Sequence, residues 1–206
     1  MLPPAEDIGQ VDAAGTATGR PPRADALRNT DALLAAALAV FASSGVDAPV
    51  REIAARAGVG VATLYRHFPT RAGLIAAVFR REIDACADAA QALAVDYPPG
   101  EALARWMQRF AAFIATKRGL ATALHSGDPA YEPLPAHFEQ RLTPALAGLL
   151  AAAVAAGEVR GDIEAGELLD AVARLCMRAR VDQPGHAERM VSLLVDGLRY
   201  GATGKP

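Results

Sequence analysis

One stretch of the chain decides its fold: Val50-Arg51-Glu52-Ile53-Ala54-Ala55-Arg56-Ala57-Gly58-Val59-Gly60-Val61-Ala62-Thr63-Leu64-Tyr65-Arg66-His67-Phe68. Ile53 and Ala54 give its first half a short inward face, and Leu64 and Phe68, four residues apart, do the same for its second half. Between them, Gly58 can supply the positive φ that a sharp reversal between two helices requires. The stretch therefore predicts two short helices joined by a tight turn, the plan of a helix-turn-helix DNA-binding unit.

The second of these helices has outward positions whose side chains suit a DNA major groove, about 12 Å wide. They are Val61, Ala62, Thr63, Tyr65, Arg66 and His67. Val61 and Ala62 offer only apolar contacts, so the choice of base sequence would rest on Thr63, Arg66 and the shape of the DNA. A place in the core for Tyr65 and a helix-capping role for His67 are the alternatives.

The flanking sequence extends this unit in both directions. Apolar residues at helical spacing predict a helix over 24–44, and Thr70 is a suitable N-cap for a helix that begins at Arg71. Residues 1–22 are rich in Pro, Gly, Thr and Ala without a period, and we expect a disordered N-terminal arm there. Arg23 follows this arm, either as part of a solvated linker or as part of an arm that reaches DNA.

The composition predicts an all-α chain of about nine helices. Hydrophobic residues make up 52% of the sequence and aromatic residues only 5%, because Ala and Leu, both good helix formers, supply the apolar content. Beyond the helix-turn-helix domain at 23–70, a helical domain over 71–206 is expected to bind a ligand and to form a dimer. Its predicted helices cover 71–95, 101–117, 120–125, 136–156, 164–180 and 187–200.

The charge is divided unevenly along the chain. Residues 20–83 contain nine Arg and five acidic residues, a local charge of +4 on a chain whose net charge is −2. A basic segment on an acidic chain suits a surface that binds a polyanion such as double-stranded DNA, although solvated faces also reach this charge.

Several functional classes are not supported by the sequence. Cys86 and Cys176 lie in apolar helical runs without metal-ligand spacing, which predicts buried thiols in a reducing cytoplasm and neither metal nor cofactor. No membrane span or secretion signal is found. The pairs His125 with Asp128 and His137 with Glu139 lack the spacing of a metal or acid–base site, so no enzyme is expected.

Val50–Phe68, followed by Pro69-Thr70-Arg71-Ala72-Gly73-Leu74, resembles the signature of the TetR/AcrR family of transcriptional regulators, and the resemblance covers about residues 23–83. It implies DNA-backbone contacts by Tyr65 and His67 and base contacts by Val61, Ala62 and Thr63. It also implies that Arg71 clamps a phosphate and that Arg51 lies at the flanking backbone. Gly60 departs from the family, which often has Ser there, and one helix cap is lost.

For the larger domain, the resemblance implies a ligand pocket after residue 84 and a homodimer formed by the last two helices. The segments 117–120 and 193–199 further resemble an SbtR-like subgroup. Apolar stripes on the last two helices suit either an intramolecular core or a dimer interface; they are Leu168, Leu169, Val172 and Leu175, and Met190, Leu193, Leu194 and Leu198.

Aromatic and polarisable residues are the candidates for the pocket. Trp106, Phe110 and Phe113 recur at helical spacing, so packing in the core is the alternative for them. A position at a helix end is the alternative for His125. The candidates in full are Trp106, Phe110, Phe113, His125, Tyr131, Phe138, Cys176 and Met177. Few of them carry charge, which favours a mostly apolar small molecule. The expected function is a repressor that binds a palindromic operator as a dimer and is released by that ligand. The alternatives are control by a protein partner and action as an activator.

Overall fold

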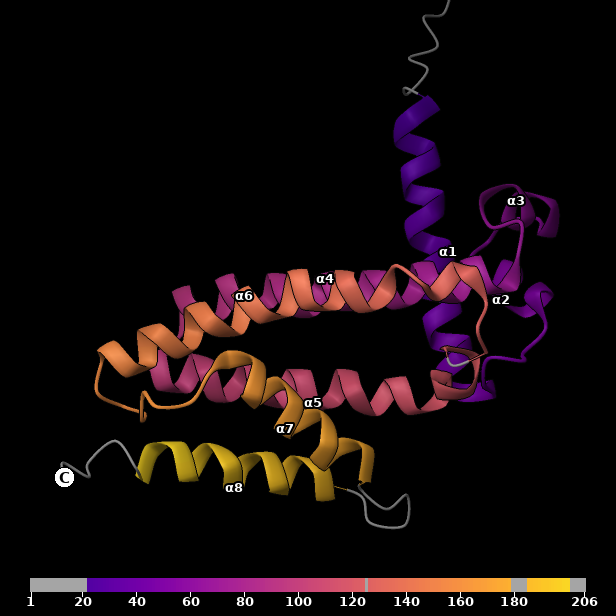
Figure 1. Cartoon of the computed structure of the whole chain (residues 1–206). Helices are drawn as coiled ribbons and strands as arrows, with labels where there is room; N and C mark the ends of the chain where they lie inside the picture. Colours follow the sequence, from indigo (N-terminus) through magenta and orange to yellow (C-terminus); the bar gives the residue numbers. More distant parts are fainter. Residues whose placement is uncertain (1–21, 125, 179–184, 201–206) are drawn as a thin grey trace, which may run out of the picture.

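The described part of the chain is entirely helical (Figure 1). The computed structural model describes residues 22–124, 126–178 and 185–200. The elements are α1 (Pro22–Ser44), α2 (Val50–Arg56), α3 (Val61–His67), α4 (Arg71–Asp96), α5 (Pro99–Leu124), the short 3-10 helix η1 (Pro129–Tyr131), α6 (Leu134–Ala155), α7 (Ala165–Arg178) and α8 (His186–Tyr200). The predicted all-α class is confirmed. Among these helices, none is long and apolar enough to cross a membrane.

The described residues form eight α-helices rather than the predicted nine, because one predicted boundary does not exist. Separate helices were expected over 101–117 and 120–125, but α5 continues without a break from Pro99 to Leu124. Arg118 and Gly119 lie between the two predicted helices, and of these only Gly119 disfavours a helix, at a cost of about 1 kcal/mol relative to alanine. Without a proline beside it, this cost does not end a helix that packs against its neighbours.

The three N-terminal helices pack around a small apolar core. Ile53 on α2 and Leu64 on α3 are fully buried, as the sequence pattern predicted. Gly58 has φ +70° at the end of α2. Its N–H donates to the carbonyl of Ala55, and that of Val59 donates to the carbonyl of Ala54. This pair of hydrogen bonds is the Schellman motif, so the predicted turn glycine ends α2 and starts the reversal into α3.

Helix α4 joins the N-terminal helices to the rest of the molecule. It begins at the predicted cap, because the Thr70 hydroxyl oxygen accepts a hydrogen bond from the Gly73 N–H at 3.0 Å. Farther along α4, Arg81 Nη1 donates to the carbonyl oxygen of Asp31 on α1 at 2.8 Å. The connecting helix is therefore tied to α1 by a hydrogen bond from one of its side chains.

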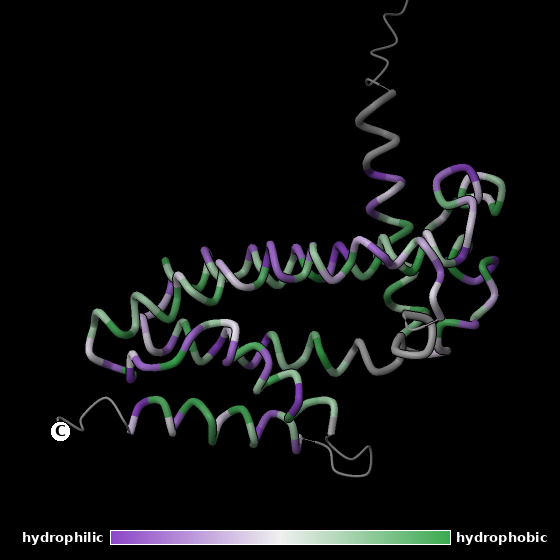
Figure 2. The backbone as a smooth tube through the Cα atoms, viewed as in Figure 1, coloured by the Kyte–Doolittle hydropathy of each residue, from purple (hydrophilic) through white to green (hydrophobic). Residues whose placement is uncertain are grey.

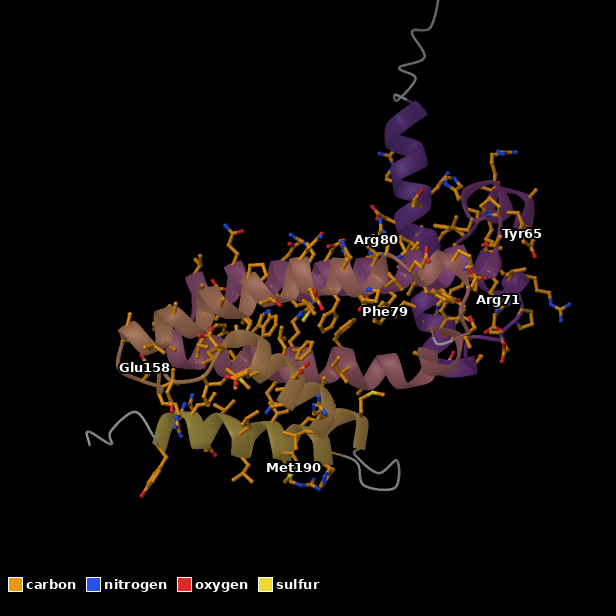
Figure 3. All side chains as sticks on the ribbon, in the orientation of Figure 1. Tyr65, Arg71, Phe79, Arg80, Glu158 and Met190 are labelled. Carbon is orange, nitrogen blue, oxygen red and sulfur yellow. The ribbon has the colours of Figure 1, made fainter. Side chains whose placement is uncertain are left out.

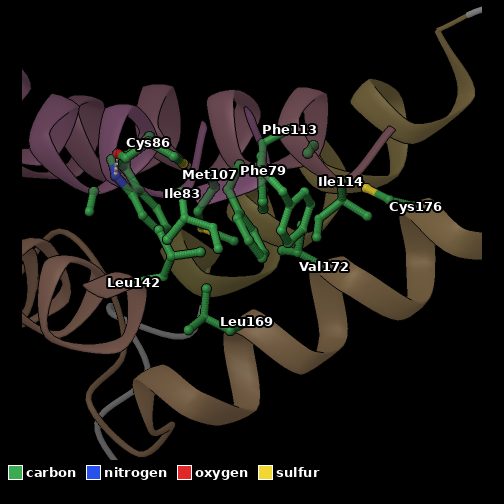
Figure 4. Close-up of a cluster of buried hydrophobic side chains, with 14 of the residues drawn as sticks. Phe79, Ile83, Cys86, Met107, Phe113, Ile114, Leu142, Leu169, Val172 and Cys176 are labelled. Carbon is green, nitrogen blue, oxygen red and sulfur yellow. Dashed lines mark hydrogen bonds between the residues drawn. The ribbon is translucent and has the colours of Figure 1, made fainter. Parts of the chain in front are cut away.

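The larger domain is a helical bundle in which α4, α5 and α6 lie side by side, with α7 and α8 packed against α5 (Figure 1). Apolar positions fill the space between the helices (Figure 2). Trp106 is fully buried; its ring stacks on Phe110 with centroids 5.6 Å apart, and its Nε1 donates to the carbonyl of Cys86 at 2.8 Å (Figure 4). The only tryptophan thus joins α5 to α4 through both packing and a satisfied polar group.

A cluster of charged side chains holds α6 against α4 on the outside of this core. Asp84 Oδ1 accepts from Arg141 Nε at 2.8 Å and lies 2.9 Å from His137 Nε2. Arg141 Nη2 also donates to Asp88 Oδ1 at 2.6 Å. We refer to Asp84, Asp88, His137 and Arg141 as the α4–α6 clamp.

Candidate DNA-binding helix and ligand cavity

The outward face of α3 is a compact surface of mixed polarity. Leu64 anchors the helix with 1% of its surface exposed, whereas Tyr65 is 47% exposed. Val61, Ala62 and Arg66 are also exposed, and Thr63 is half-buried. Figure 3 shows Tyr65 on the side of α3 that faces away from the bundle. The core alternative for Tyr65 therefore does not hold, because its side chain remains open to solvent.

His67 is held by a neighbour from another helix. Its Nδ1 lies 3.1 Å from the hydroxyl oxygen of Thr30 on α1, and the residue is half-buried. The hydrogen bond fixes the orientation of the ring at the end of α3 and links α3 to α1. Contact between His67 and the DNA backbone stays a prediction.

The predicted basic contacts differ in how far they are available to a phosphate. Arg51 is exposed at the second position of α2, where the free N–H groups of the helix terminus also favour an anion. Arg71 Nη2 instead donates to the carbonyl oxygen of Ala48 at 2.7 Å, and its Nη1 donates to that of Val46. Its guanidinium thus already holds the loop between α1 and α2. The side chain of Arg23, in the first turn of α1, lies outside the described residues.

A cavity of about 840 Å³ lies among α4, η1, α6 and α7. Its walls combine aromatic and aliphatic side chains with carboxylates, an amide and a hydroxyl. The lining residues are Phe79, Tyr131, Leu134, Pro135, Phe138, Glu139, Gln140, Thr143, Gly166, Leu169 and Asp170. Its volume matches that of pockets that take small organic ligands.

Of the seven predicted pocket residues that the structure describes, two, Tyr131 and Phe138, line this cavity. Trp106, Phe110 and Cys176 are at most 1% exposed and belong to the packed core (Figure 4). Phe113 joins that core, 5.3 Å from Phe79 between ring centroids. Helical spacing alone did not separate a ligand-lining aromatic stripe from a core stripe.

The other two predicted pocket residues are Met177 and His125. Met177 is 45% exposed and points from α7 without joining the lining. His125 lies outside the described residues. Phe79 on α4, Glu139 on α6 and Asp170 on α7 were not predicted, because residues so far apart in sequence share a wall only once the helices have packed.

Two titratable groups near the cavity and core are kept neutral. Burial raises the pKa of the Tyr131 hydroxyl, and the carboxylate of Asp128 adds to this effect. Burial raises the pKa of the Cys86 thiol to about 12, with an opposing contribution from Arg109 and a further increase from Glu82. Neither group is therefore charged near neutral pH.

One of the two pairs weighed as a catalytic or metal site lies within the described residues, and the other, His125 with Asp128, includes a residue outside them. His137 pairs with Asp84 in the α4–α6 clamp rather than with Glu139. Within the residues that the structure describes, no three His, Cys, Asp or Glu side chains gather in a way that could hold a metal ion.

A shallow apolar groove of about 400 Å³ runs between α7 and α8. Its lining is Arg160, Ile163, Leu175, Met190, Leu193, Leu194, Gly197 and Leu198. Leu193 is 64% exposed, a large open fraction for a leucine, and Met190 lies on the same helix (Figure 3). The stripes predicted on these helices thus divide. Leu168, Leu169 and Val172 belong to the core, while Leu175 and all four residues of the α8 stripe line the groove.

Family models match both halves of the chain. Residues 33–78 match the model described as bacterial regulatory proteins of the tetR family. Residues 98–200 match the model for the C-terminal domain of SbtR-like transcriptional regulators. No curated protein sequence matches the chain significantly.

Solved structures agree with these matches. The chain is 41% identical to a TetR transcriptional regulator of Streptomyces coelicolor, with a TM-score of 0.71 and coverage of 82% of this chain and 98% of the other. It is 37% identical to a TetR regulator of Mycobacterium vanbaalenii, with a TM-score of 0.70 and coverage of 87% and 99%. It is also similar to a gamma-butyrolactone receptor described as ArpA-like, at 25% identity, a TM-score of 0.56 and coverage of 84% and 90%.

These regulators bind DNA through the N-terminal unit, and their family is not one of enzymes. The matches span α3 as well as most of the larger helical domain. The chain therefore belongs to the TetR family of transcriptional regulators and carries an SbtR-like C-terminal domain.

Proposed function

We propose that this regulator is a cytoplasmic repressor that binds a palindromic operator as a homodimer and leaves it when a small molecule occupies the cavity. The observation that carries the proposal is the open face of α3, where Tyr65 and Arg66 stand beside Val61 on a helix anchored by buried Leu64. Phosphate and base contacts need side chains of this kind on a rigid support.

The contacts to DNA follow from the chemistry of this face. The Tyr65 hydroxyl and the Arg51 guanidinium suit phosphate oxygens, which position the protein on the duplex. Val61 and Ala62 suit thymine methyl groups, while Thr63 and Arg66 offer hydrogen bonds to base edges. Because several of these contacts are to phosphates, the affinity for DNA should fall steeply as salt is added. Because few of them read base edges by hydrogen bonds, the choice of sequence should depend on DNA shape.

The α7–α8 groove supports the homodimer. An exposed apolar groove on a helix pair is costly to leave in water, and a two-fold axis through it would pair the groove with its own copy. Two protomers related in this way present two α3 helices to the two halves of a palindrome.

The cavity is coupled to DNA binding through α6 and α4. Phe138 lines the cavity beside His137, whose partner Asp84 lies on α4. The same α4 holds α1 through Arg81 and the α1–α2 loop through Arg71. A ligand that shifts α6 would therefore act on α4 and change the separation of the two α3 helices. The name of the similar gamma-butyrolactone receptor supports a small-molecule ligand for this chain too.

Genomic fragment selection with the purified full-length protein tests DNA binding directly. The proposal expects enrichment of a near-palindrome, with half-sites about one helical turn or more apart, and a dimer on light scattering. Placing that site upstream of a reporter gene should lower expression. Enrichment of no site, or higher expression, would contradict the repressor proposal.

The dimer is tested by a charge placed in the groove. Leu193→Lys should shift the mass measured by light scattering from dimer toward monomer. Val95→Lys is the matched control, because Val95 is also an exposed apolar residue (81%) but lies at the end of α4, away from the groove. A dimer that survives the first substitution would exclude this interface.

A further inference from the structure

The cavity has an apolar floor and an acidic rim. Phe79, Tyr131 and Leu169 are buried residues of the floor. Glu139 on α6 and Asp170 on α7 are exposed residues of the lining. Among the described residues, the lining contains two carboxylates and no Lys, Arg or His, so the formal charge of this part of the lining is negative.

Neither carboxylate is neutralised by a close cation. Glu139 has no ion-pair or hydrogen-bond partner among the described residues. The nearest cationic atom to Asp170 is Arg174 Nη2 at 3.9 Å, in a pair that is about four-fifths exposed and so holds Asp170 only weakly. Both carboxylates can accept hydrogen bonds from a ligand.

Pro144 leaves one backbone carbonyl of α6 without its usual helical partner. Pro144 lies inside the helix and has no N–H, so the hydrogen bond that would end on the carbonyl of Gln140 is missing. Gln140 is itself a lining residue. An orphaned carbonyl favours a ligand that brings a donor.

Tyr131 brings an unpartnered polar group to the floor. The residue is 8% exposed, and its hydroxyl makes no hydrogen bond to any described residue. Because this oxygen is not one of the fully buried unpartnered atoms of the described residues, it is open to solvent in the cavity, and a bound ligand with an N–H group would donate to it in place of water. Phe79, Tyr131 and Phe138 also present aromatic rings, which attract cations.

We propose that the cavity takes an organic cation with an apolar or aromatic body and a protonated amine. The body would fill the apolar floor, while the ammonium would donate to Glu139, Asp170 and the free acceptors. The two carboxylates would repel an anionic or phosphorylated ligand of the same shape. The claim that such a ligand regulates DNA binding rests on the proposed function. The charge preference of the cavity does not depend on that function.

Two fluorescent probes of opposite charge test the preference. Dansylcadaverine and dansyl-6-aminohexanoate share the dansyl group and five methylenes, and end in an ammonium and a carboxylate respectively. Titrated into the full-length protein at low salt, dansylcadaverine should bind about tenfold more tightly, and the ratio should shrink as salt is added. Equal binding, tighter binding of the carboxylate, or binding of neither probe would overturn the proposal.

Charge-removing variants assign the preference to the rim. The double variant Glu139→Gln/Asp170→Asn should bring the two probes to within about twofold of each other. The control Glu132→Gln/Asp96→Asn removes the same number of charges from exposed positions outside the lining and should keep the preference. A control variant that loses as much preference as the rim variant would show an effect of net charge alone and would refute the assignment.

A cavity-filling variant assigns the probe to the cavity. A Cβ added at Gly166, on the cavity wall, meets no atom within 4 Å, so the side chain of Gly166→Phe should begin in open space, narrow the cavity and weaken binding of dansylcadaverine at least about tenfold. Gly148→Phe is the matched control: Gly148 is also open, but lies outside the lining. Unchanged binding in the Gly166 variant would place the probe elsewhere and overturn the proposal.

Operator binding, measured on the same preparations, separates this inference from the proposed function. A protein that binds its operator but shows no charge preference refutes the inference alone. A protein that prefers the cation but binds no DNA supports the inference and refutes the proposed function.

Discussion

Arg71 Nη2 lies 2.7 Å from the carbonyl oxygen of Ala48, so the first residue of α4 holds the loop between α1 and α2. Arg71 Nη1 donates a second hydrogen bond to the carbonyl oxygen of Val46, so one guanidinium holds two carbonyls of this loop. Hydrogen bonds from a charged donor are stronger than neutral ones. The position of α2, and of α3 behind it, therefore depends on a residue that sequence resemblance assigned to DNA.

Substitution of Arg71 separates the two roles. Arg71→Ala should lower the free energy of unfolding by about 1–3 kcal/mol, because it removes charge-assisted hydrogen bonds to two carbonyls. Arg71→Lys keeps the charge but lacks the fork that reaches both oxygens, so it should recover only part of that stability. Chemical denaturation and gel shifts measure the two effects. If Arg71→Ala keeps its full stability but loses affinity for DNA, the structural role of Arg71 is wrong and only its contact with a phosphate remains.

Tyr65→Ala should weaken operator binding by at least about tenfold, equivalent to about 1.4 kcal/mol, without lowering the melting temperature. The reason is that Tyr65 is 47% exposed and contributes little to the core. Tyr65→Phe should lose most of the same affinity if the hydroxyl contacts a phosphate. Tyr200→Ala, at an 88% exposed tyrosine on α8, should leave DNA binding unchanged. Equal affinity in the Tyr65 variants and the wild type would remove this residue from the interface.

The local features of the DNA-binding unit were predictable from sequence because each depends on a few neighbouring residues. Gly58 ends α2 with a positive φ, Thr70 caps α4, and Leu64 anchors α3. The additional tie from Arg71 was not predictable, because its carbonyl partners lie in another loop and side-chain type does not specify backbone acceptors.

The cavity was less predictable for a different reason. Trp106 and Phe138 are both aromatic residues on helices, yet one stacks in the core and the other lines the cavity. Which of these occurs depends on the shape left between α6 and α7 after packing. The acidic rim has the same origin, because Glu139 and Asp170 are remote in sequence.

The α4–α6 clamp offers a test of coupling between helices. Asp84 accepts from Arg141 and contacts His137, whereas Asp88, 72% exposed, contacts Arg141 alone. Asp84→Asn should therefore destabilise by about 0.5–1 kcal/mol, and Asp88→Asn by less, because these partly exposed pairs are screened by solvent. Urea denaturation measures both, and a double-mutant cycle with Arg141→Gln isolates the pair. Equal losses in the two Asn variants would contradict the central place of Asp84.

The buried Cys86 thiol predicts a pH effect above pH 9. Its pKa rises from 9.0 to about 12 in the folded protein, so above pH 9 the unfolded chain loses this proton while the folded chain keeps it. The stabilising contribution is complete below pH 9 and disappears as the pH approaches 12. Between pH 8 and 11 the wild type should lose more stability than Cys86→Ala in urea denaturation.

Iodoacetamide at pH 8 should leave Cys86 unlabelled until denaturant is added, and rapid labelling of the folded protein would contradict its burial.

Two helical glycines distinguish a stability effect from an interface effect. A Cβ added at Gly148 on α6 or at Gly197 on α8 meets no atom within 4 Å of the same chain. Gly148→Ala should therefore stabilise the protein by about 0.5–1 kcal/mol through helix propensity.

Gly197 instead lines the α7–α8 groove, where the proposed partner protomer would approach closely. Gly197→Leu should leave the protomer folded but raise the dimer dissociation constant at least about tenfold, because the added side chain fills space that the partner needs. Light scattering across a dilution series measures this, with Gly148→Leu as the control that keeps the wild-type dissociation constant. If both leucine variants remain dimeric at the same dilution, the two-fold contact lies outside this groove.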